Sequence, residues 1–309
     1  MPRIKVIVNP KAGRGHGARL SPRVAACLAE RGADFDLVHT AGPGHAIELA
    51  RQAVDEGFEI VVSVGGDGTS NEIVNGLMSR ANGGPVGTLG WVPAGSGNDF
   101  AMMNGAPWDT EAACDLIMRG TTRLVDVGRV TFDGRLTRYF DNAVGIGFDG
   151  LVVRETQKLK HVRGLAMYLP AVLKTVFLSL RPIHAHAILD DKSFDAAHLM
   201  IVIANGPREG GSFLVAPNAR CDDSYLDIIT AAQMSKLRML AMIPQFLKGT
   251  HLGDPRIGEA RARRVTIRSE DPLYFHVDGE ILCAEAHKVE AELLPLTLRV
   301  ISPEGDGQR

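Results

Sequence analysis

The sequence predicts an α/β protein with two domains, in which a doubly wound domain with a mostly parallel sheet precedes an antiparallel β-sandwich. Two observations support this fold class. Up to about residue 120, apolar β-branched runs alternate with stretches whose apolar residues recur at helical spacing, as in parallel sheets covered by helices. Beyond that point, short apolar runs are separated by turns rather than helices, which indicates antiparallel pairing. A chain of 309 residues is long enough for two ordinary domains.

The N-terminal half supplies four strands and the helices between them. The predicted strands cover residues 4–8, 35–39, 60–64 and 86–92. Four helices are predicted between and after these strands: one that ends near residue 31, one at residues 44–56, one directly after the third strand, and one at residues 110–118. Because ligands bind beyond the carboxyl ends of strands in such sheets, the loops after these strands are the candidate binding loops.

The C-terminal half is rich in strands. One helix is predicted at residues 235–248, and the predicted strands cover residues 122–131, 139–144, 184–189, 198–204, 225–230, 264–268, 273–276, 287–291 and 296–301. We place the domain boundary near Leu124, so that the first domain covers residues 1–124 and the β-sandwich covers residues 125–294. The arginine-rich run 256–268 is expected to include a solvated edge strand.

The composition is that of an ordinary globular protein. Hydrophobic residues make up 45% and charged residues 23% of the chain, and the formal net charge is −2. This charge gives no reason to expect binding to nucleic acid. The four cysteines are scattered without a C-x-x-C pair, and the N-terminus shows no apolar signal-peptide segment, so we expect a cytoplasmic location.

The longest apolar stretch covers residues 164–180, and Pro170 and Lys174 interrupt it. It is too short and too broken to predict a transmembrane helix. Two interpretations remain open: a helix buried in the core, or a helix beside a surface through which lipid reaches the protein. The basic residues just upstream, Lys158, Lys160 and Arg163, would meet lipid head groups in the second interpretation or form a solvated helix face in the first.

The most informative stretch runs from Val61 to Glu72, where an apolar run ends in glycines and a helical pattern follows. The glycines let the backbone approach a ligand closely. The free N–H groups at the start of the helix favour a phosphate group, and Asp67 and Thr69 would stand beside it. A plain βα turn is the alternative for strand, glycine and helix alone, but the full string Gly-Gly-Asp-Gly-Thr with the following Asn-Glu favours nucleotide binding.

This string resembles the nucleotide-binding signature of the diacylglycerol-kinase catalytic family, which includes soluble bacterial lipid kinases and the sphingosine and ceramide kinases. NAD kinases and 6-phosphofructokinases share a shorter Gly-Gly-Asp core. Three further matches occur in family order: Asn9-Pro10-Lys11-Ala12-Gly13, Thr40 at the end of the second strand, and Pro93-Ala94-Gly95-Ser96-Gly97-Asn98-Asp99. The resemblance implies a first domain like that of NAD kinase and phosphofructokinase, and a last strand, at about residues 295–303, that returns to it.

The resemblance also implies ATP and Mg²⁺ as cofactors. The residues that it assigns to the nucleotide are Asn9, Lys11, Thr40, Gly65, Gly66, Asp67, Gly68, Thr69, Asn71, Glu72, Gly95, Ser96, Asn98 and Asp99. Ala12 replaces a serine of the family pattern, whereas Ser96 keeps a hydroxyl. The Walker sequence G-x-x-x-x-G-K-[ST] is absent, which excludes the P-loop solution.

The string Val277-Asp278-Gly279-Glu280 resembles the Val-Asp-Gly-Glu string of the same family. It implies that Glu280 is the general base, with Asp278 and Asp67 as the other members of the catalytic set. We expect Glu280 to project into the cleft between the domains. An ordinary Asp-Gly hairpin turn is the alternative. The segments 126–128 and 142–149 also resemble interdomain segments of the family.

A loop from Ala216 to Asp227 resembles the family's loop for a structural magnesium ion. The resemblance implies that the ligands are the Asp223 carboxylate and the backbone carbonyls of Arg220 and Tyr225, and oxygen ligands suit magnesium. Ser224 stands where the family usually has glycine, so an Asp-rich turn without metal is the alternative.

These features predict an ATP-dependent lipid kinase, with diacylglycerol as the favoured acceptor and phosphatidic acid as the product. The lipid would be met at a membrane surface, by peripheral association with the inner face of the membrane, and a homodimer is left open. Two alternatives remain: a small-molecule kinase like NAD kinase, or a non-catalytic nucleotide or lipid sensor.

Overall fold

The computed structural model describes residues 2–81, 83–156, 165–178, 181–281 and 286–305. The chain forms two compact units, Met1–Val127 with Pro295–Arg309 and Gly128–Leu294, which are described one at a time. The basic residues Lys158, Lys160 and Arg163 lie outside the described residues.

The first unit is built on a parallel sheet, as the sequence predicts. Its strand order is β2-β1-β3-β4-β14, and these neighbours pair in parallel. The strands are β1 (Arg3–Val8), β2 (Asp34–His39), β3 (Ile60–Gly65), β4 (Thr88–Pro93) and the end of β14 (Ala286–Ile301). Every residue of β3 and β4 is buried, because helices cover both faces of a parallel sheet.

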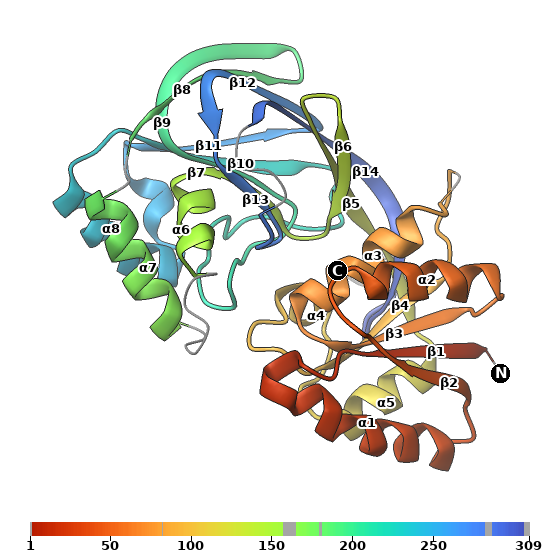
Figure 1. Ribbon diagram of the computed structural model, residues 1–309. Helices are drawn as coiled ribbons and strands as arrows, with labels where there is room; N and C mark the ends of the chain where they lie inside the picture. Colours follow the sequence, from red (N-terminus) through yellow and green to blue (C-terminus); the bar gives the residue numbers. More distant parts are fainter. Residues whose placement is uncertain (1, 82, 157–164, 179–180, 282–285, 306–309) are drawn as a thin grey trace. The chain divides into compact units, whose positions relative to one another are not determined.

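The helices of this unit lie on the two faces of its sheet (Figure 1). Helices α1 (Ala12–Glu30) and α5 (Thr110–Arg119) pack together on one face, and α2 (His45–Asp55) and α3 (Asp67–Met78) pack together on the other. The short helix α4 (Asp99–Met103) follows β4. Both α3 and α4 therefore begin directly beyond the carboxyl end of a central strand, where the sequence predicts the binding loops.

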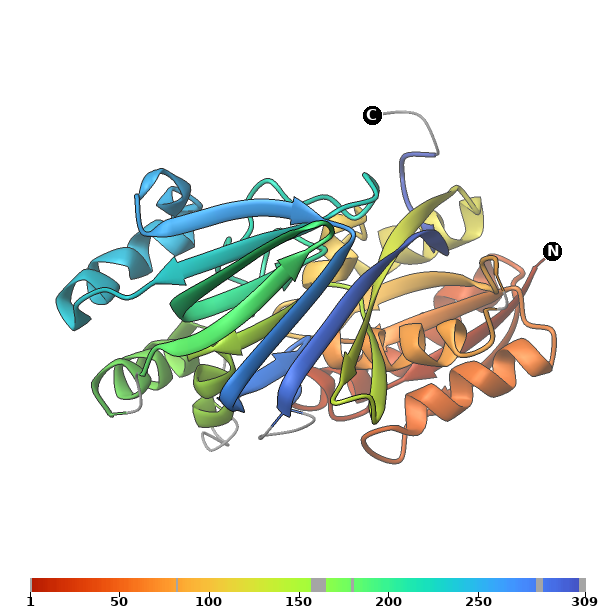
Figure 2. The ribbon, with the colours of Figure 1, turned by 90° about the horizontal axis from the view of Figure 1, so that it is seen from above.

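The second unit is antiparallel and confirms the predicted β-sandwich class. Its strands are β5 (Thr122–Phe132), β6 (Leu136–Phe140), β7 (Ala143–Gly147), β8 (Ile183–Leu189), β9 (Lys192–Ala204), β10 (Leu226–Ala232), β11 (Ile257–Ala262), β12 (Arg264–Leu273), β13 (Phe275–Val277) and the first part of β14. The long strand β9 pairs with β8 along its first half and with β7 and β10 along its second half. In Figure 2 the green and blue strands of this unit lie side by side. Alternate side chains of these strands form an apolar core, and the opposite faces of β7, β9 and β10 contribute to a second apolar cluster.

The sequence analysis missed one helix of this half, the one that follows β7, whereas the helices expected within residues 164–180 and at residues 235–248 are present. The described residues contain three helices of more than one turn: α6 (Phe148–Thr156), α7 (Leu165–Leu178) and α8 (Lys236–Lys248); a short 3₁₀ turn, His251–Gly253, follows them. Helix α6 follows β7 without an intervening loop, so the apolar run through both elements carries no boundary that periodicity could detect.

Two predicted strand boundaries were also wrong. The predicted strand 139–144 is two strands, β6 and β7, separated by a turn. The predicted strands 287–291 and 296–301 are one strand, β14, with a kink at Leu296, whose φ is +50°. The Asp126 carboxylate accepts a hydrogen bond of 2.7 Å from the Leu296 N–H, and it holds this kink.

Helix α7 has two different faces. Ala171, Val172 and Val176 are buried and pack against α6 and α8, whereas Leu173 and Phe177 are exposed. The interpretation as a core helix fits the buried face, and the interpretation as a helix beside a lipid-entry surface concerns the exposed face. Among the described residues, none of the helices combines the length and the hydropathy that crossing a bilayer requires.

Candidate functional site

The centre of the first unit's candidate site is a contact between two glycines. Gly66 ends the loop after β3, and Gly95 lies in the loop after β4. A Cβ atom placed on Gly95 would lie 2.4 Å from the Cα of Gly66, and one placed on Gly66 would lie 3.0 Å from the Cα of Gly95. No side chain fits between these backbones, so both loops must carry glycine here. The first-turn N–H groups of α3 have no side-chain cap, and they remain directed out of the helix as an anion site.

Asp67 joins the same two loops through its carboxylate. One carboxylate oxygen accepts the N–H of Asn98 at 2.7 Å, and the other accepts the N–H of Asp99 at 2.5 Å. Burial, together with the nearby Asp99 carboxylate, raises the pKa of Asp67 to about 6, against the effect of the two hydrogen bonds. The Asp67 and Asp99 carboxylates repel each other, so a cation that accompanies a phosphate group would relieve their repulsion.

The loop after β1 lies against this pair of loops. The side-chain amide nitrogen of Asn9 donates to the Thr69 hydroxyl at 2.9 Å, and its side-chain oxygen Oδ1 accepts the N–H of Lys11 at 3.0 Å. Gly13, at φ +53°, would place a Cβ atom 2.2 Å from the carbonyl oxygen of Ala94. The Asn9, Gly65–Thr69 and Gly95–Asp99 segments are therefore brought together, as the sequence predicts for strand ends of one sheet.

The other nucleotide residues of the sequence analysis divide into two groups. Lys11 and Ser96 are exposed and Thr40 is half-buried, and all three follow the ends of their strands. Asn71 and Glu72, in contrast, are buried in α3 and bond within the unit. The Glu72 carboxylate accepts the N–H groups of Gly44 at 2.7 Å and Ala46 at 3.0 Å, so it caps the start of α2. The geometry gives Asn71 and Glu72 structural contacts, and their contact with the nucleotide stays a prediction.

In the second unit, Asp278 organises the turn that follows β13. Its carboxylate accepts three consecutive backbone N–H groups, from Asp141 at 2.9 Å, Asn142 at 3.1 Å and Ala143 at 2.7 Å. Burial raises the pKa of Asp278 even though these donors favour the ionised form. Asp278 itself takes φ +46°. This residue therefore acts by fixing two turns, which sequence reasoning did not foresee.

The same turn presents Glu280, whose side chain is 41% exposed. One of its carboxylate oxygens lies 3.2 Å from a guanidinium nitrogen of Arg138 on β6. The Glu280 carboxylate is therefore half-exposed, on a turn that buried hydrogen bonds hold in place.

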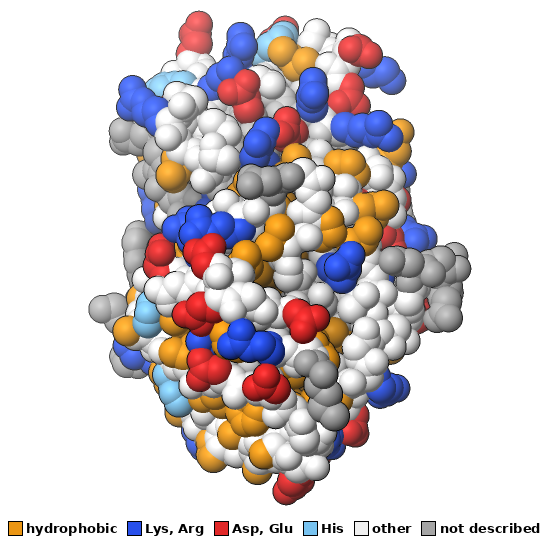
Figure 3. Space-filling view, turned by 90° about the vertical axis from the view of Figure 1, so that its right-hand side faces the viewer, with side chains coloured by type: hydrophobic (Ala, Val, Ile, Leu, Met, Phe, Trp, Pro, Cys, Tyr) orange, Lys and Arg blue, Asp and Glu red, His pale blue; other side chains and the backbone are white. Residues whose placement is uncertain are grey.

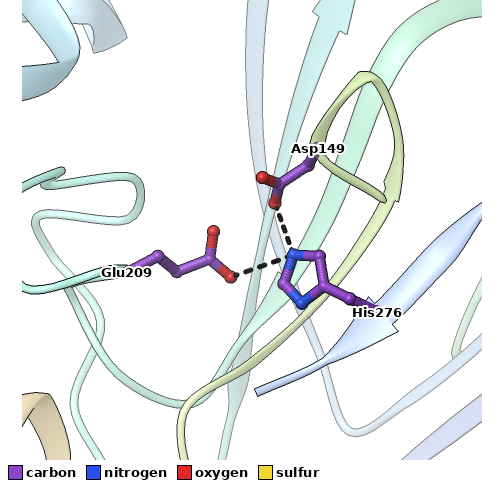
Figure 4. Close-up of side chains that lie close together, drawn as sticks. All are labelled: Asp149, Glu209 and His276. Carbon is purple, nitrogen blue, oxygen red and sulfur yellow. Dashed lines mark hydrogen bonds and ion pairs between the residues drawn. The ribbon is translucent and has the colours of Figure 1, made fainter. Parts of the chain in front are cut away.

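A cluster of three side chains lies behind this turn and was missed by the sequence analysis (Figure 4). The Nε2 atom of His276 lies 3.0 Å from a carboxylate oxygen of Asp149 and 3.9 Å from one of Glu209. Burial opposes ionisation of Asp149, but His276 more than offsets this effect, and the pKa of Asp149 lies below its usual range. Asp149 ends the segment 142–149, which is quoted above without a role, and His276 immediately precedes the Val277–Glu280 string, whereas Glu209 carries no sequence signal.

The predicted structural metal loop does not fit its ion. The guanidinium group of Arg261 on β11 binds the Asp223 carboxylate, lies 3.4 Å from Asp227, and stacks over the Tyr225 ring at 4.8 Å. The other Asp223 oxygen accepts the N–H of Tyr225 at 3.1 Å, and Ser224 keeps the tight turn with φ +64°. Arg261 thus already neutralises the carboxylate that was assigned to magnesium. The loop keeps its shape without an ion bound to Asp223 and to the backbone carbonyls of Arg220 and Tyr225.

Comparison with known proteins agrees with this geometry. The sequence-family model of the diacylglycerol kinase catalytic domain matches residues 3–130. The family model of the YegS C-terminal NAD kinase beta sandwich-like domain matches residues 142–302. A diacylglycerol kinase of Mycobacterium tuberculosis H37Rv is 30% identical over 304 residues, which cover 97% of this chain and 95% of that protein. A diacylglycerol kinase of Bacillus subtilis 168 is 30% identical over 283 residues, 91% of this chain and 90% of that protein.

Solved structures show the same fold. A crystal structure of a diacylglycerol kinase from Bacillus anthracis strain Sterne has a TM-score of 0.75 at 23% identity and covers 97% of both chains. Fold and site together define a lipid kinase built from an α/β nucleotide unit and a β-sandwich unit. The chain belongs to the diacylglycerol kinase family. The interpretations as an NAD kinase-like enzyme and as a non-catalytic sensor are not supported, because the curated relatives are diacylglycerol kinases.

The arginine at Asp223 generates a prediction about metal. The thermal unfolding temperature of the wild-type protein should be the same in EDTA and in millimolar Mg²⁺. Arg261→Gln should lower it by a few degrees, because it leaves Asp223 and the buried Asp227 without their cation at a cost of about 1–3 kcal/mol. Mg²⁺ should then restore part of the loss.

Arg263→Gln is the matched control, since Arg263 also lies over the Tyr225 ring, at 5.1 Å, but makes no ion pair with Asp223 among the described contacts. It should not create a response to Mg²⁺. A wild-type protein that loses stability in EDTA would show that the loop holds a structural ion after all.

Proposed function

We propose that this lipid kinase transfers the γ-phosphate of ATP to a lipid hydroxyl, with diacylglycerol as the acceptor and phosphatidic acid as the product. The observation that carries the proposal is the contact of Gly66 with Gly95 beside the uncapped start of α3. It exposes backbone N–H groups where an ATP phosphate can bind without interference from side chains. The names of the curated relatives support diacylglycerol as the acceptor.

Asp67 and Asp99 fit the metal that accompanies ATP. Bound Mg²⁺ would neutralise the negative charge that develops on the phosphate oxygens, including the leaving oxygen, during transfer. Burial raises the pKa of Asp67 to about 6, so its ionised carboxylate would be stabilised by a bound cation. Thr69, held by Asn9, adds a hydroxyl at the start of α3.

Glu280 is the general base in this proposal. A lipid hydroxyl becomes an effective nucleophile when its proton has an acceptor within hydrogen-bond reach, and an exposed carboxylate provides one. Arg138 on β6 lies 3.2 Å from one Glu280 oxygen and helps to hold the carboxylate in place. Asp278 contributes by holding the turn, because its oxygens already accept three backbone N–H groups.

The direct test is transfer of labelled phosphate from ATP to lipids in mixed micelles. The wild-type protein should label diacylglycerol in preference to sphingosine, ceramide or NAD. Glu280→Gln should reduce turnover by about 10²–10⁴-fold, the usual contribution of general base catalysis, and should leave the affinity for ATP nearly unchanged.

Glu290→Gln is a suitable control, because Glu290 is a carboxylate of β14 whose ion pair is with Lys288. It should keep wild-type turnover. Preferential labelling of NAD would contradict the proposed substrate, and wild-type turnover by Glu280→Gln would contradict the proposed base.

We also propose that the lipid is met at a membrane surface through α7 and α8. Among the described residues these two helices carry three large exposed hydrophobic side chains: Leu173 is 37%, Phe177 52% and Leu237 79% exposed. The Lys236 ammonium group donates to the Phe177 carbonyl at 2.8 Å, which places a cation beside the apolar groups. We call Leu173, Phe177 and Leu237 the apolar patch. A cation next to exposed apolar side chains matches the interface of an anionic bilayer.

The remaining surface gives little support for attraction by a general field. On the face shown in Figure 3, positive and negative side chains are interspersed, in agreement with the net charge of −2. Membrane association would therefore depend on the apolar patch more than on net charge. The homodimer that the sequence leaves open stays a prediction.

Replacing the patch should weaken membrane binding without changing the chemistry. Burial of one Phe or Leu side chain is worth about 1.5–3 kcal/mol, so Phe177→Ser and Leu237→Ser should each lower partition into anionic vesicles roughly tenfold or more. Vesicle sedimentation measures this, and activity on monomeric short-chain diacylglycerol should be unchanged. Leu136→Ser, at 47% exposure on β6, is the control and should sediment like the wild type; equal partition of all three variants would contradict the assignment.

A further inference from the structure

The imidazole of His276 connects the acidic cluster to the turn that carries Glu280. Its Nδ1 atom accepts the backbone N–H of Gly279 at 3.2 Å, and its Nε2 atom lies 3.0 Å from Asp149 (Figure 4). The His276 side chain is 3% exposed, so water does not replace either bond easily. Gly279 immediately precedes Glu280, and the position of this N–H therefore helps to fix the direction in which Glu280 leaves the turn.

These two bonds assign the tautomer of His276. A nitrogen that accepts an N–H must present its lone pair, so Nδ1 carries no proton. The proton then lies on Nε2, which donates to Asp149. The ligand atoms of His276, Asp149 and Glu209 lie within 4.8 Å of one another, close enough for a metal site. A metal would need the Nε2 lone pair of His276, however, and the proton on Nε2 argues against such a site.

The strand opposite His276 leaves room for this arrangement. Gly145 of β7 is the cross-strand partner of His276. A Cβ atom on Gly145 would lie 2.1 Å from the Asp149 carboxylate and 2.4 Å from His276 Nε2, so any larger residue would separate the pair. A glycine in the middle of a strand costs stability, and here it makes space for a polar contact.

We infer that His276 and Asp149 are positioning residues for Glu280: Asp149 fixes the Nε2–H tautomer and the ring orientation, and Nδ1 then holds the Gly279–Glu280 peptide. In this role the pair acts on the turn that carries Glu280 and contacts neither ATP nor the lipid. This inference rests on the proposed function of Glu280 and adds the device that keeps that carboxylate in place. Misplacement by about 1 Å can lower turnover as much as 10²-fold, which sets the size of the expected effect.

Two amide substitutions separate the two bonds of the imidazole. His276→Asn keeps an acceptor near the Nδ1 position, whereas His276→Gln keeps a donor near the Nε2 position and loses the acceptor. We expect His276→Gln to lower kcat by about 10–10²-fold with little change in KM for ATP, and His276→Asn to lose less. Asp149→Asn should stay near the wild type because its amide oxygen still accepts, and Asp149→Ala should behave like His276→Gln. Equal losses in His276→Asn and His276→Gln would overturn the inference.

A double-mutant cycle distinguishes positioning from a general loss of structure. In a Glu280→Gln background, His276→Gln should cause no further loss of turnover, because it acts through Glu280. Additive losses would contradict the inference and leave the proposed function intact, whereas absence of lipid phosphorylation by the wild type would contradict the proposed function. Long-range ¹H–¹⁵N spectra give a readout that does not need activity: the signal lost in His276→Gln should show the Nε2–H tautomer. An Nδ1–H or doubly protonated ring would overturn the inference.

Discussion

The approach of the Gly66 and Gly95 backbones is the constraint on which the first unit's site depends. Because a single added carbon would lie 2.4 Å from the opposite Cα, the two loops after β3 and β4 meet through backbone alone. Asp67 then closes the arrangement by accepting N–H groups from the second loop. The start of α3 is left without a capping side chain, and the burial that holds Asp67 also raises its pKa to about 6. A single packing requirement therefore produces both the backbone arrangement that we propose binds phosphate and the carboxylate that we propose lies beside its cation.

The second unit uses buried polar groups to support one exposed carboxylate. Asp278 satisfies three backbone donors, and His276 satisfies a fourth beside Glu280. Buried polar groups are stabilising when every bond is made and costly when one is lost, so this turn has little freedom to move. Glu280 alone among these side chains is substantially exposed. Within the five residues from His276 to Glu280, His276 and Asp278 therefore hold the turn, and Glu280 is the residue proposed to act as the base.

The features that depend only on residues close together in the sequence were predicted correctly. The buried β-branched runs of β1, β3 and β4 and the glycine loops after them were found correctly, because burial on both faces and glycine requirements are visible within a few residues. The kink at Leu296 was not, since Asp126, which holds it, is 170 positions away. The fate of Asp223 was also invisible, because Arg261 reaches it from another strand. Asn71 and Glu72 lie in a family motif but serve the packing of α2 and α3, which resemblance alone cannot separate from ligand contact.

The central claim is that ATP binds where Gly66 and Gly95 meet. Isothermal titration of a non-hydrolysable ATP analogue into Gly95→Ala tests it most directly, with Gly84→Ala as the matched control, because a Cβ atom on Gly84 meets nothing within 4 Å. The account predicts at least about a tenfold loss of affinity, roughly 1.4 kcal/mol, for Gly95→Ala and none for Gly84→Ala. Wild-type affinity in a folded Gly95→Ala protein would contradict it.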